Sequence, residues 1–251
     1  GRMADATRAP ILAQPNAGLP ELVEGRTVFP LRPDEFAGSM ERLVTVGASM
    51  VGGCCGTMPE HIRVLRDRLG GARPVRREVA SALRLSSRMS TVATGRGLPF
   101  TVVGERINPT NRDDLTADLL EGRTETVLSD ARSQRDAGAH VLDVNLGVPG
   151  IDEGLVMPRV ALALENAVSA PLSIDSADPE TFEKTLPVLA GKPLMNSVPG
   201  TEERMERVLP LAARFGAGVV CLALDESGIP ATAEARIGFL RRIVRAAERH
   251  G

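Results

Sequence analysis

Carboxylate and amide side chains recur along the second part of this chain, each at or just after the end of a short apolar run. Side chains of this kind donate and accept hydrogen bonds in fixed directions, which suits a binding or catalytic site. A buried polar group without a partner costs several kcal/mol, so one shared site explains the repeated pattern better than a series of separate helix caps. The candidate residues are Glu105, Asn108, Asp143, Asn145, Asp175, Ser176, Asn196 and Asp225.

A second set of candidates is the adjacent pair Cys54 and Cys55 in the sequence GGCCGT. Neighbouring cysteines seldom form a disulfide with each other because its geometry is strained, whereas thiolates are preferred zinc ligands. The pair alone leaves two interpretations open, a zinc site or two free thiols beside a glycine-rich turn. The remaining cysteine, Cys221, stands alone, and free thiols favour a reducing compartment, here the cytoplasm.

The elements that must position the polar residues alternate regularly. Apolar runs predict strands, and amphipathic segments between them predict helices. Strands alternating with helices indicate parallel βαβ units, and the carboxyl ends of such strands meet at one mouth, where active sites lie. The predicted strands are 100–107, 139–145, 171–176, 193–198 and 218–225; the predicted helices are 113–120, 124–137, 153–168, 179–189, 201–215 and 232–249.

Changes in composition divide the chain into three segments. Residues 1–71 predict two strand–helix units, and residues 100–251 predict the alternating units described above. Residues 72–99 are rich in Arg and Ser and show weak periodicity, which predicts a solvated linker.

Composition excludes several classes of partner. The formal net charge is -2, Trp and Tyr are absent and there are six Phe, so neither electrostatics nor aromatic stacking favours binding to nucleic acid. No apolar run approaches the roughly 20 residues that a membrane helix requires, so no membrane partner is expected. The three histidines, His61, His140 and His250, fit no catalytic pattern.

Two motif sets resemble known families. GGCCGTMPEHI (52–62), with PNAGLP (15–20) upstream, resembles the end of the zinc-dependent homocysteine methyltransferase barrel. Motifs in the second part resemble the pterin-binding domain of cobalamin-dependent methionine synthases and the related methyltetrahydrofolate:corrinoid methyltransferases. These motifs are GERINPTN (104–111), DVNLGVPGIDE (143–153), SIDSADPE (173–180), GKPLMNSVPG (191–200) and LDESGIP (224–230).

The resemblance implies a fold made from parts of two TIM-type (β/α) barrels. Residues 1–71 would be the C-terminal portion of a homocysteine- and zinc-binding barrel. Residues 100–251 would be the N-terminal portion of a pterin-binding, dihydropteroate synthase-like barrel, with five of eight strands. The family's further pterin-contacting residues would fall after residue 251, so we expect the isolated chain to be inactive.

The resemblance also implies an activity. Methyl transfer from 5-methyltetrahydrofolate, through a corrinoid, to zinc-activated homocysteine would give methionine and tetrahydrofolate. Cys54 and Cys55 would supply two of three zinc ligands, the third lying before residue 1. The corrinoid must come from another module or protein, because the chain has no D-x-H-x-x-G signature.

The same resemblance assigns roles within the pterin site. Asp175 and Asn196 would contact the ring, and Ser176 would be a hydrogen-bonding neighbour. Asn196 and Asp143 are the residues expected to act in catalysis. Asn145, with Asp143, Glu105 and Asn108, would support the ring contacts, and Asp225 is expected to contribute less.

Two alternatives of other kinds stay open. One is a dihydropteroate synthase-like enzyme with the same barrel, against which the GERIN sequence and the GGCC block argue. The other is a truncated, non-catalytic chain that binds folate weakly or serves as a scaffold.

Overall fold

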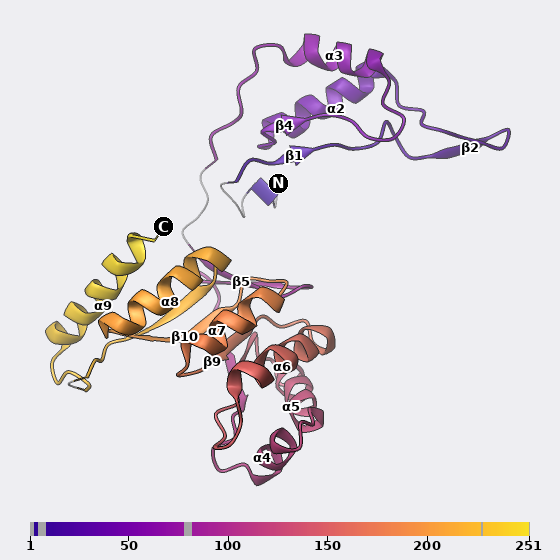
Figure 1. Ribbon diagram of the computed structural model, residues 1–251. Helices are drawn as coiled ribbons and strands as arrows, with labels where there is room; N and C mark the ends of the chain where they lie inside the picture. The colour runs from indigo at the N-terminus through magenta and orange to yellow at the C-terminus, as the bar shows by residue number, and fades with distance from the viewer. Residues whose placement is uncertain (1–2, 5–8, 78–81, 227, 251) are drawn as a thin grey trace. The chain divides into compact units, whose positions relative to one another are not determined.

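The chain forms two compact units, residues 1–81 and residues 82–251. The computed structural model describes residues 3–4, 9–77, 82–226 and 228–250 (Figure 1). Each unit is described by itself below. None of the described helices combines the length and apolar character needed to cross a bilayer.

The first unit pairs two short strands and packs two helices together. Strands β1 (Leu12–Ala13) and β4 (Met50–Val51) are parallel, and β2 (Glu21–Val23) and β3 (Arg26–Val28) form an antiparallel hairpin. Helices α2 (Pro33–Thr45) and α3 (Pro59–Leu69) both begin with proline, whose fixed φ suits the first helical position. Their contact buries a small core of Ala17, Phe36, Ala37, Met40 and Leu65.

The second unit is built on a five-stranded parallel sheet whose strands lie side by side in chain order. The strands are β7 (Val103–Ile107), β8 (Val141–Asn145), β9 (Leu172–Asp175), β10 (Leu194–Pro199) and β11 (Gly218–Leu222). The helices are α4 (Asp113–Leu120), α5 (Glu125–Asp136), α6 (Glu153–Ala167), α7 (Pro179–Thr185) with the short 3₁₀ helix η1 (Leu186–Val188), α8 (Glu202–Phe215) and α9 (Ala233–Glu248).

The order of these elements identifies the architecture. Each helix contacts the next one along the chain, so the helices form a single layer over the sheet. Sequential parallel strands under one helical layer are typical of an arc of a (β/α) barrel, because a doubly wound sheet would reverse its strand order and carry helices on both faces. The sheet is open, with β7 and β11 at its two edges among the described residues. The predicted fold class is confirmed.

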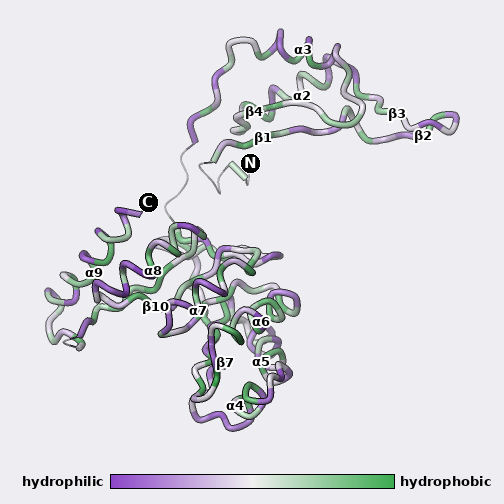
Figure 2. Tube along the Cα trace, in the orientation of Figure 1, coloured by the Kyte–Doolittle hydropathy of each residue, from purple (hydrophilic) through white to green (hydrophobic). Residues whose placement is uncertain are grey.

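Apolar side chains between the sheet and the helices form the main core. Most of β8 and β9 is buried, and so is the inward face of the amphipathic helices. Figure 2 shows the hydrophobic and hydrophilic residues alternating along these helices. The largest contributors are Phe182, Met157, Met195, Ile174 and Leu164, each fully buried.

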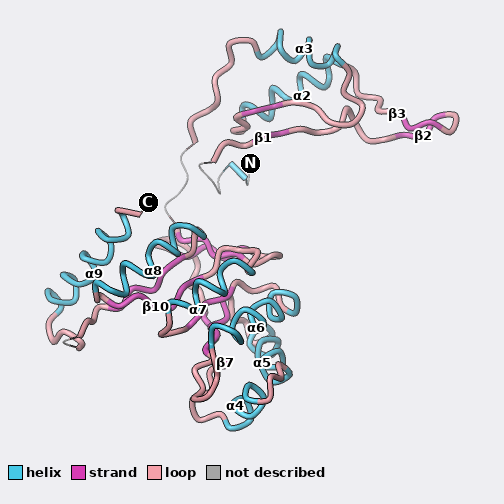
Figure 3. Tube along the Cα trace, viewed as in Figure 1, coloured by secondary structure: helices cyan, strands magenta, loops and turns pink. Residues whose placement is uncertain are grey.

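The structure differs from the sequence prediction in residues 72–99. Part of this expected linker is a hairpin of β5 (Leu83–Ser86) and β6 (Thr91–Thr94), seen as strands in Figure 3. The hairpin covers the amino ends of the sheet strands: the backbone N–H of Ser86 donates to the carbonyl of Lys192 at 2.9 Å, and the N–H of Lys192 donates to Ser86 Oγ at 2.8 Å. Leu85 is only 2% exposed.

The reason for the difference is the short period of a strand. Alternate residues of β5 face opposite sides. Leu83 and Leu85 therefore share one face, and Arg84 and Ser86 share the other. Gly218, at the start of β11, lies directly against both leucines. Two apolar residues in an Arg- and Ser-rich segment produce no strong periodic signal, although tertiary packing uses both.

We predict that Leu85→Ala lowers the free energy of unfolding of the second unit by about 2–4 kcal/mol, because the substitution leaves a cavity at a fully packed position. Urea denaturation of the 251-residue chain measures the change. Thr91→Ala, at an exposed position of the same hairpin, is the matched control and should have little effect. An equally small effect of Leu85→Ala would mean that residues 72–99 are a solvated linker after all.

Candidate functional site

The parallel register of three neighbouring strands places polar residues side by side. Asn145 on β8 is aligned with Asp175 on β9, which is aligned with Asn196 on β10. Asp143 lies two residues before Asn145 and therefore on the same face of β8. We call Asp143, Asn145, Asp175 and Asn196 the amide–carboxylate cluster.

Two hydrogen bonds pair the members of the cluster across the strands. Asn145 Nδ2 donates to Asp175 Oδ2 at 2.8 Å, and Asn196 Nδ2 donates to Asp143 Oδ1 at 3.2 Å. The backbone N–H of Gly147 donates to Asn145 Oδ1 at 2.9 Å. Because a backbone N–H can only donate, this bond fixes which end of the Asn145 amide faces Asp175.

Asp143 is the most buried carboxylate of the cluster, with 4% of its surface exposed. Burial raises the pKa of Asp143 above its usual value, and the charges of Asp175 and Glu105 add to this rise. The Ser173 hydroxyl and the Asn196 amide act in the opposite direction and lower the pKa of Asp143. The Ser173 hydroxyl does so from close by, without a hydrogen bond of normal geometry. The carboxylates of Asp143, Asp175 and Glu105 therefore lie near one another on three neighbouring strands. This concentration of acceptors favours a ligand rich in hydrogen-bond donors.

Ser176 is connected to the cluster through its backbone rather than its hydroxyl. The Ser176 N–H donates to the carbonyl of Asn196 at 2.9 Å. Its hydroxyl donates to Glu153 Oε2 at 2.6 Å and accepts from the N–H of Asp178 at 3.0 Å. The sequence analysis missed Glu153, because an acidic residue in the first turn of a helix is explained by the helix dipole alone.

A cavity of about 450 Å³ opens beside the cluster. Its wall combines the carboxylates of Asp175, Asp225 and Glu226 with the apolar side chains of Leu222 and Leu224. Acceptors beside an apolar surface suit a flat heterocycle that carries donors on one edge.

Asp225 lines this cavity but does not end a strand. Strand β11 stops at Leu222, three residues earlier, and Asp225 Oδ2 lies 3.5 Å from the guanidinium of Arg242 on α9. The ion pair joins this carboxylate to α9. Asp225 lines the same cavity as Asp175, although it is not part of a sheet strand.

Two residues on and just after β7, Glu105 and Asn108, are joined to the cluster less directly. Asn108 Nδ2 donates to Glu105 Oε1 at 3.4 Å, and Asn108 Oδ1 accepts from the N–H of Thr110 at 3.0 Å. Glu105 is close enough to raise the pKa of Asp143. Glu105 therefore belongs to the electrostatic surroundings of the cluster, and Asn108 is linked to them through Glu105.

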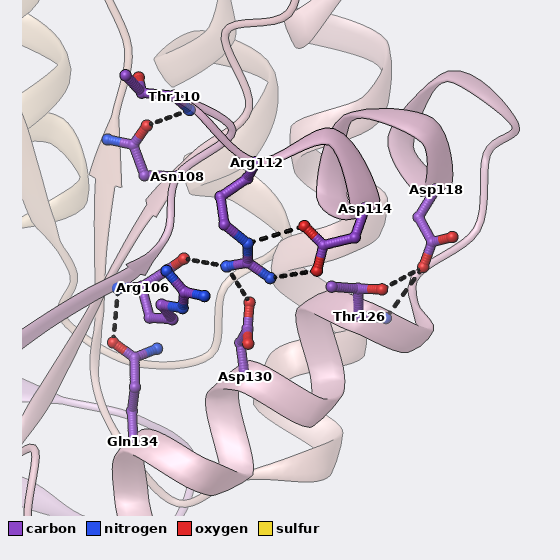
Figure 4. A network of polar contacts seen from close by, with 9 residues as sticks. All are labelled: Arg106, Asn108, Thr110, Arg112, Asp114, Asp118, Thr126, Asp130 and Gln134. Atoms are coloured by element: carbon purple, nitrogen blue, oxygen red, sulfur yellow. Dashed lines mark hydrogen bonds and ion pairs between the residues drawn. The ribbon is translucent and has the colours of Figure 1, made fainter.

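An arginine that the sequence analysis did not single out holds the loop after β7. Arg112 donates to both carboxylate oxygens of Asp114, at 2.8 and 2.7 Å, and to Asp130 Oδ2 at 3.0 Å and the carbonyl of Arg106 at 3.2 Å (Figure 4). Gln134 on α5 accepts from the N–H of Arg106 at 2.7 Å. The guanidinium holds the pKa of Asp114 well below its usual range. Helix α5 thereby fixes the end of β7, which carries Glu105, and the loop after it, which begins with Asn108.

The cysteine pair in the first unit lies in the turn that follows β4. Both side chains are exposed, and the two Sγ atoms are 3.8 Å apart. Two thiolates bound to a tetrahedral zinc at about 2.3 Å would lie about 3.8 Å apart, so this spacing fits two ligands of one zinc ion. The neighbouring Cys54 thiol raises the pKa of Cys55. Among the described residues, no group of three or more His, Cys, Asp or Glu side chains is arranged to hold a metal ion.

The segment Pro15–Ala17 holds the cysteine turn in place. The Cys54 N–H donates to the carbonyl of Pro15 at 3.0 Å, and the Ala17 N–H donates to the carbonyl of Cys55 at 2.9 Å. Asn16 Oδ1 accepts from the Cys55 N–H at 3.2 Å. The sequence analysis quoted this segment only as part of a motif, because no local pattern predicts a contact between residues 38 or more positions apart.

The His61 and His140 side chains form hydrogen bonds with backbone groups. His61 Nδ1 accepts from the N–H of Met58 at 3.2 Å, so its Nε2–H donates to the carbonyl of Leu31 at 2.9 Å. His140 Nδ1 accepts from the N–H of Val102 at 3.0 Å.

Comparison with known proteins gives two family matches. A model described as "Pterin binding enzyme" matches residues 104–251, and one described as "Homocysteine S-methyltransferase" matches residues 2–69. Two curated relatives are "Methionine synthase" of Mycobacterium tuberculosis, 31% identical over 243 residues, and "Methionine synthase" of Mycobacterium leprae, 31% identical over 248 residues. Each alignment covers 94% of this chain but only 20% and 21% of the relatives, so the chain spans about a fifth of their length.

Solved structures with a similar fold include two dihydropteroate synthases. The Yersinia pestis enzyme with a pterine-sulfa conjugate has a TM-score of 0.49 and 20% identity, over 67% of this chain and 60% of that one. The Vibrio fischeri enzyme has a TM-score of 0.48 and 20% identity, over 68% and 63% of the two chains.

We predict that Arg112→Ala lowers the free energy of unfolding of the second unit by about 1–3 kcal/mol, because it leaves the half-buried carboxylate of Asp130 and the carbonyl of Arg106 without their donor. Arg112→Lys should recover only part of this loss, since one ammonium group cannot reproduce the planar, forked contact. Urea denaturation measures both. Arg132→Ala, at an exposed position of α5, is the control, and equal effects of Arg112→Ala and Arg132→Ala would contradict the brace.

Proposed function

The chain belongs to the pterin-binding enzyme family through residues 104–251, and from this premise we propose that the second unit binds the pterin ring of 5-methyltetrahydrofolate at the amide–carboxylate cluster. The observation that supports the proposal most directly is the alignment of Asn145, Asp175 and Asn196 across three neighbouring strands, with two hydrogen bonds inside the cluster. A barrel mouth is where such sites form.

The hydrogen bonds determine what the cluster offers to a ligand. Asp175 Oδ2 is occupied by Asn145, which leaves Oδ1 to accept from a ligand. The NH₂ group of Asn196 is directed to Asp143, which leaves its carbonyl oxygen as an acceptor. Two acceptors match the amino group and ring N–H on one edge of a pterin.

The full reaction that we propose is methyl transfer from 5-methyltetrahydrofolate to homocysteine, giving methionine and tetrahydrofolate. It is supported by the homocysteine S-methyltransferase match over residues 2–69 and by the similarity to methionine synthases. The same match favours methyl transfer over the dihydropteroate synthase-like alternative. Because the chain spans about a fifth of those relatives, we propose that a corrinoid-carrying module or protein and the rest of both sites come from outside it.

The residues of this chain bind and orient the two substrates. Asn196 is the proposed catalytic residue, because it contacts the ring whose N5 must carry a proton for tetrahydrofolate to leave as an amine. Asp143 acts on the ring through Asn196, Asp175 contacts the ring directly, and Ser176 contributes its backbone. Asn145 supports Asp175, with Glu105 and Asn108 behind them. We place this reaction in the cytoplasm, where the free cysteines would stay reduced.

The first unit would hold zinc through Cys54 and Cys55, whose sulfur spacing fits the ion. Bound zinc lowers the pKa of a substrate thiol, so that homocysteine reacts as a thiolate. Pro15–Ala17 keeps the two thiols on a rigid turn. We propose that the 251-residue chain binds its ligands without completing the reaction alone.

We predict that Asp175→Ala and Asn196→Ala each weaken the binding of 5-methyltetrahydrofolate by about 1–3 kcal/mol, because each removes an acceptor from a buried ligand donor. Asp225→Ala should weaken it less, since Asp225 is already paired with Arg242. Isothermal titration of the 251-residue chain measures all three. Asp136→Ala, on the exposed side of α5, is the control. Unchanged affinity after Asp175→Ala would rule out the proposed pterin site.

We also predict that Cys54→Ser and Cys55→Ser strongly reduce zinc affinity, whereas Cys221→Ser leaves it unchanged. Zinc must displace protons from thiols, and the pKa of Cys55 is raised by the neighbouring Cys54 thiol, so affinity should increase as pH rises through the range in which the two thiols ionise. Titration against a chromophoric chelator at several pH values measures this. Loss of zinc binding in Cys221→Ser would refute a site confined to the first unit.

A further inference from the structure

We infer that Asp143 is a positioning residue whose charge decides which end of the Asn196 amide faces the ligand. The inference rests on the proposed pterin site and concerns the regulation of that site by pH. Its basis is a juxtaposition: a nearly fully buried carboxylate on β8 accepts a side-chain hydrogen bond that orients Asn196 on β10.

The chemistry of the two groups sets the orientation. An ionised carboxylate can only accept hydrogen bonds, whereas an amide has a donor end and an acceptor end. While Asp143 is ionised, the NH₂ group of Asn196 must point toward it, and the carbonyl oxygen of Asn196 points away. In this state Asn196 presents an acceptor to the donor edge of a pterin.

The second amide of the cluster lacks this freedom. Asn145 Oδ1 is held by the backbone N–H of Gly147, which cannot change its role as a donor. Its NH₂ group therefore faces Asp175 whatever the pH. The cluster thus combines one locked amide with one whose orientation depends on a neighbouring charge.

The surroundings of Asp143 allow that charge to be lost. Glu105 on β7 and Asp175 on β9 face it with negative charge, Ser173 lies opposite on β9, and Asn196 is its partner on β10. Burial and the two like charges favour the protonated acid. A protonated Asp143 carries an O–H that can donate to Asn196 Oδ1, so the amide is free to turn and to present its NH₂ group instead.

The same argument predicts opposite effects on binding and stability. Because the pKa of folded Asp143 is raised, its contribution to stability is fully present below the unfolded pKa and is lost as pH rises through the folded pKa. Asp143→Asn mimics the protonated acid. It should therefore raise the melting temperature of the chain at neutral pH, although it weakens pterin binding. A merely structural residue would show losses in both.

The first test needs no ligand. In the ¹⁵N-labelled 251-residue chain, the side-chain amide signal of Asn196 is assigned by its loss in Asn196→Ser and followed from about pH 8 down to pH 4, across the range in which a raised aspartate pKa lies. The signal should shift with the titration of Asp143 in the original chain and stay constant in Asp143→Asn. A signal that does not titrate, or that titrates equally in both proteins, would overturn the inference.

The second test measures the consequence with two probes, pterin and lumazine, which carries a carbonyl oxygen in place of the pterin amino group. At pH 7 Asp143→Asn should bind pterin about tenfold more weakly, the factor that corresponds to one hydrogen bond. Its preference for pterin over lumazine should be smaller, and the loss of affinity toward acid pH should disappear. Wild-type preference and pH dependence in this variant would contradict the inference.

A matched control is Glu165→Gln. Glu165 on α6 is as buried as Asp143, but it accepts from the N–H of Ala190, outside the cluster. This variant should alter stability and leave the pterin affinity, the pterin-to-lumazine preference and the Asn196 signal unchanged. If no protein, including the original chain, bound pterin, the proposed function would fail, while the Asn196 signal would still decide the role of Asp143.

Discussion

A carboxylate buried in a water-excluding sheet must find partners close by, and the polar side of the second unit is arranged around this requirement. Asp143 has 4% of its surface exposed; the amide of Asn196 donates to it and the Ser173 hydroxyl also favours its ionised form, while two other carboxylates lie near it. Such a group is destabilising when ionised. Strand β8 can carry it because the parallel register brings Asn196 within hydrogen-bonding distance from two strands away.

The two ends of the sheet serve different purposes. At the amino ends, the β5–β6 hairpin contributes apolar burial and backbone hydrogen bonds, which add stability. At the carboxyl ends, polar contacts replace apolar packing. There Arg112 forms ion pairs with Asp114 and with Asp130 on α5, and these hold the loop after β7. Barrels commonly divide stability and function between their ends in this way. The second unit retains that division although its sheet is open among the described residues.

In the first unit, hydrogen bonds from a neighbouring segment likewise hold two side chains in position. Two thiols that could bind one metal ion must be held on adjacent residues, and a short turn does this only if its backbone is fixed. The segment Pro15–Ala17 supplies that support through three hydrogen bonds to Cys54 and Cys55. Gly56, with φ of 76°, adopts a left-handed conformation and lies directly against Phe29, where a side chain would collide. Both units therefore place polar side chains on or soon after a parallel strand and fix them from a neighbouring segment.

The sequence by itself determined the alternation of strands and helices after residue 100, the parallel sheet and the placing of Asp143, Asn145, Asp175 and Asn196 on its strands. Each of these depends on local periodicity and on the two-residue repeat of a strand. Tertiary structure alone decided which groups of the cluster pair: Asn145 with Asp175, and Asn196 with Asp143. It also decided that the Ser176 hydroxyl donates to Glu153 and that Arg112 binds Asp130. It buried Leu85 in the core, although the sequence predicts a linker there. These contacts join residues of different elements, and no local pattern encodes which of several polar groups at a barrel mouth will meet. The physical reason is that hydrogen-bond direction and burial depend on the register between strands, which only the folded chain sets.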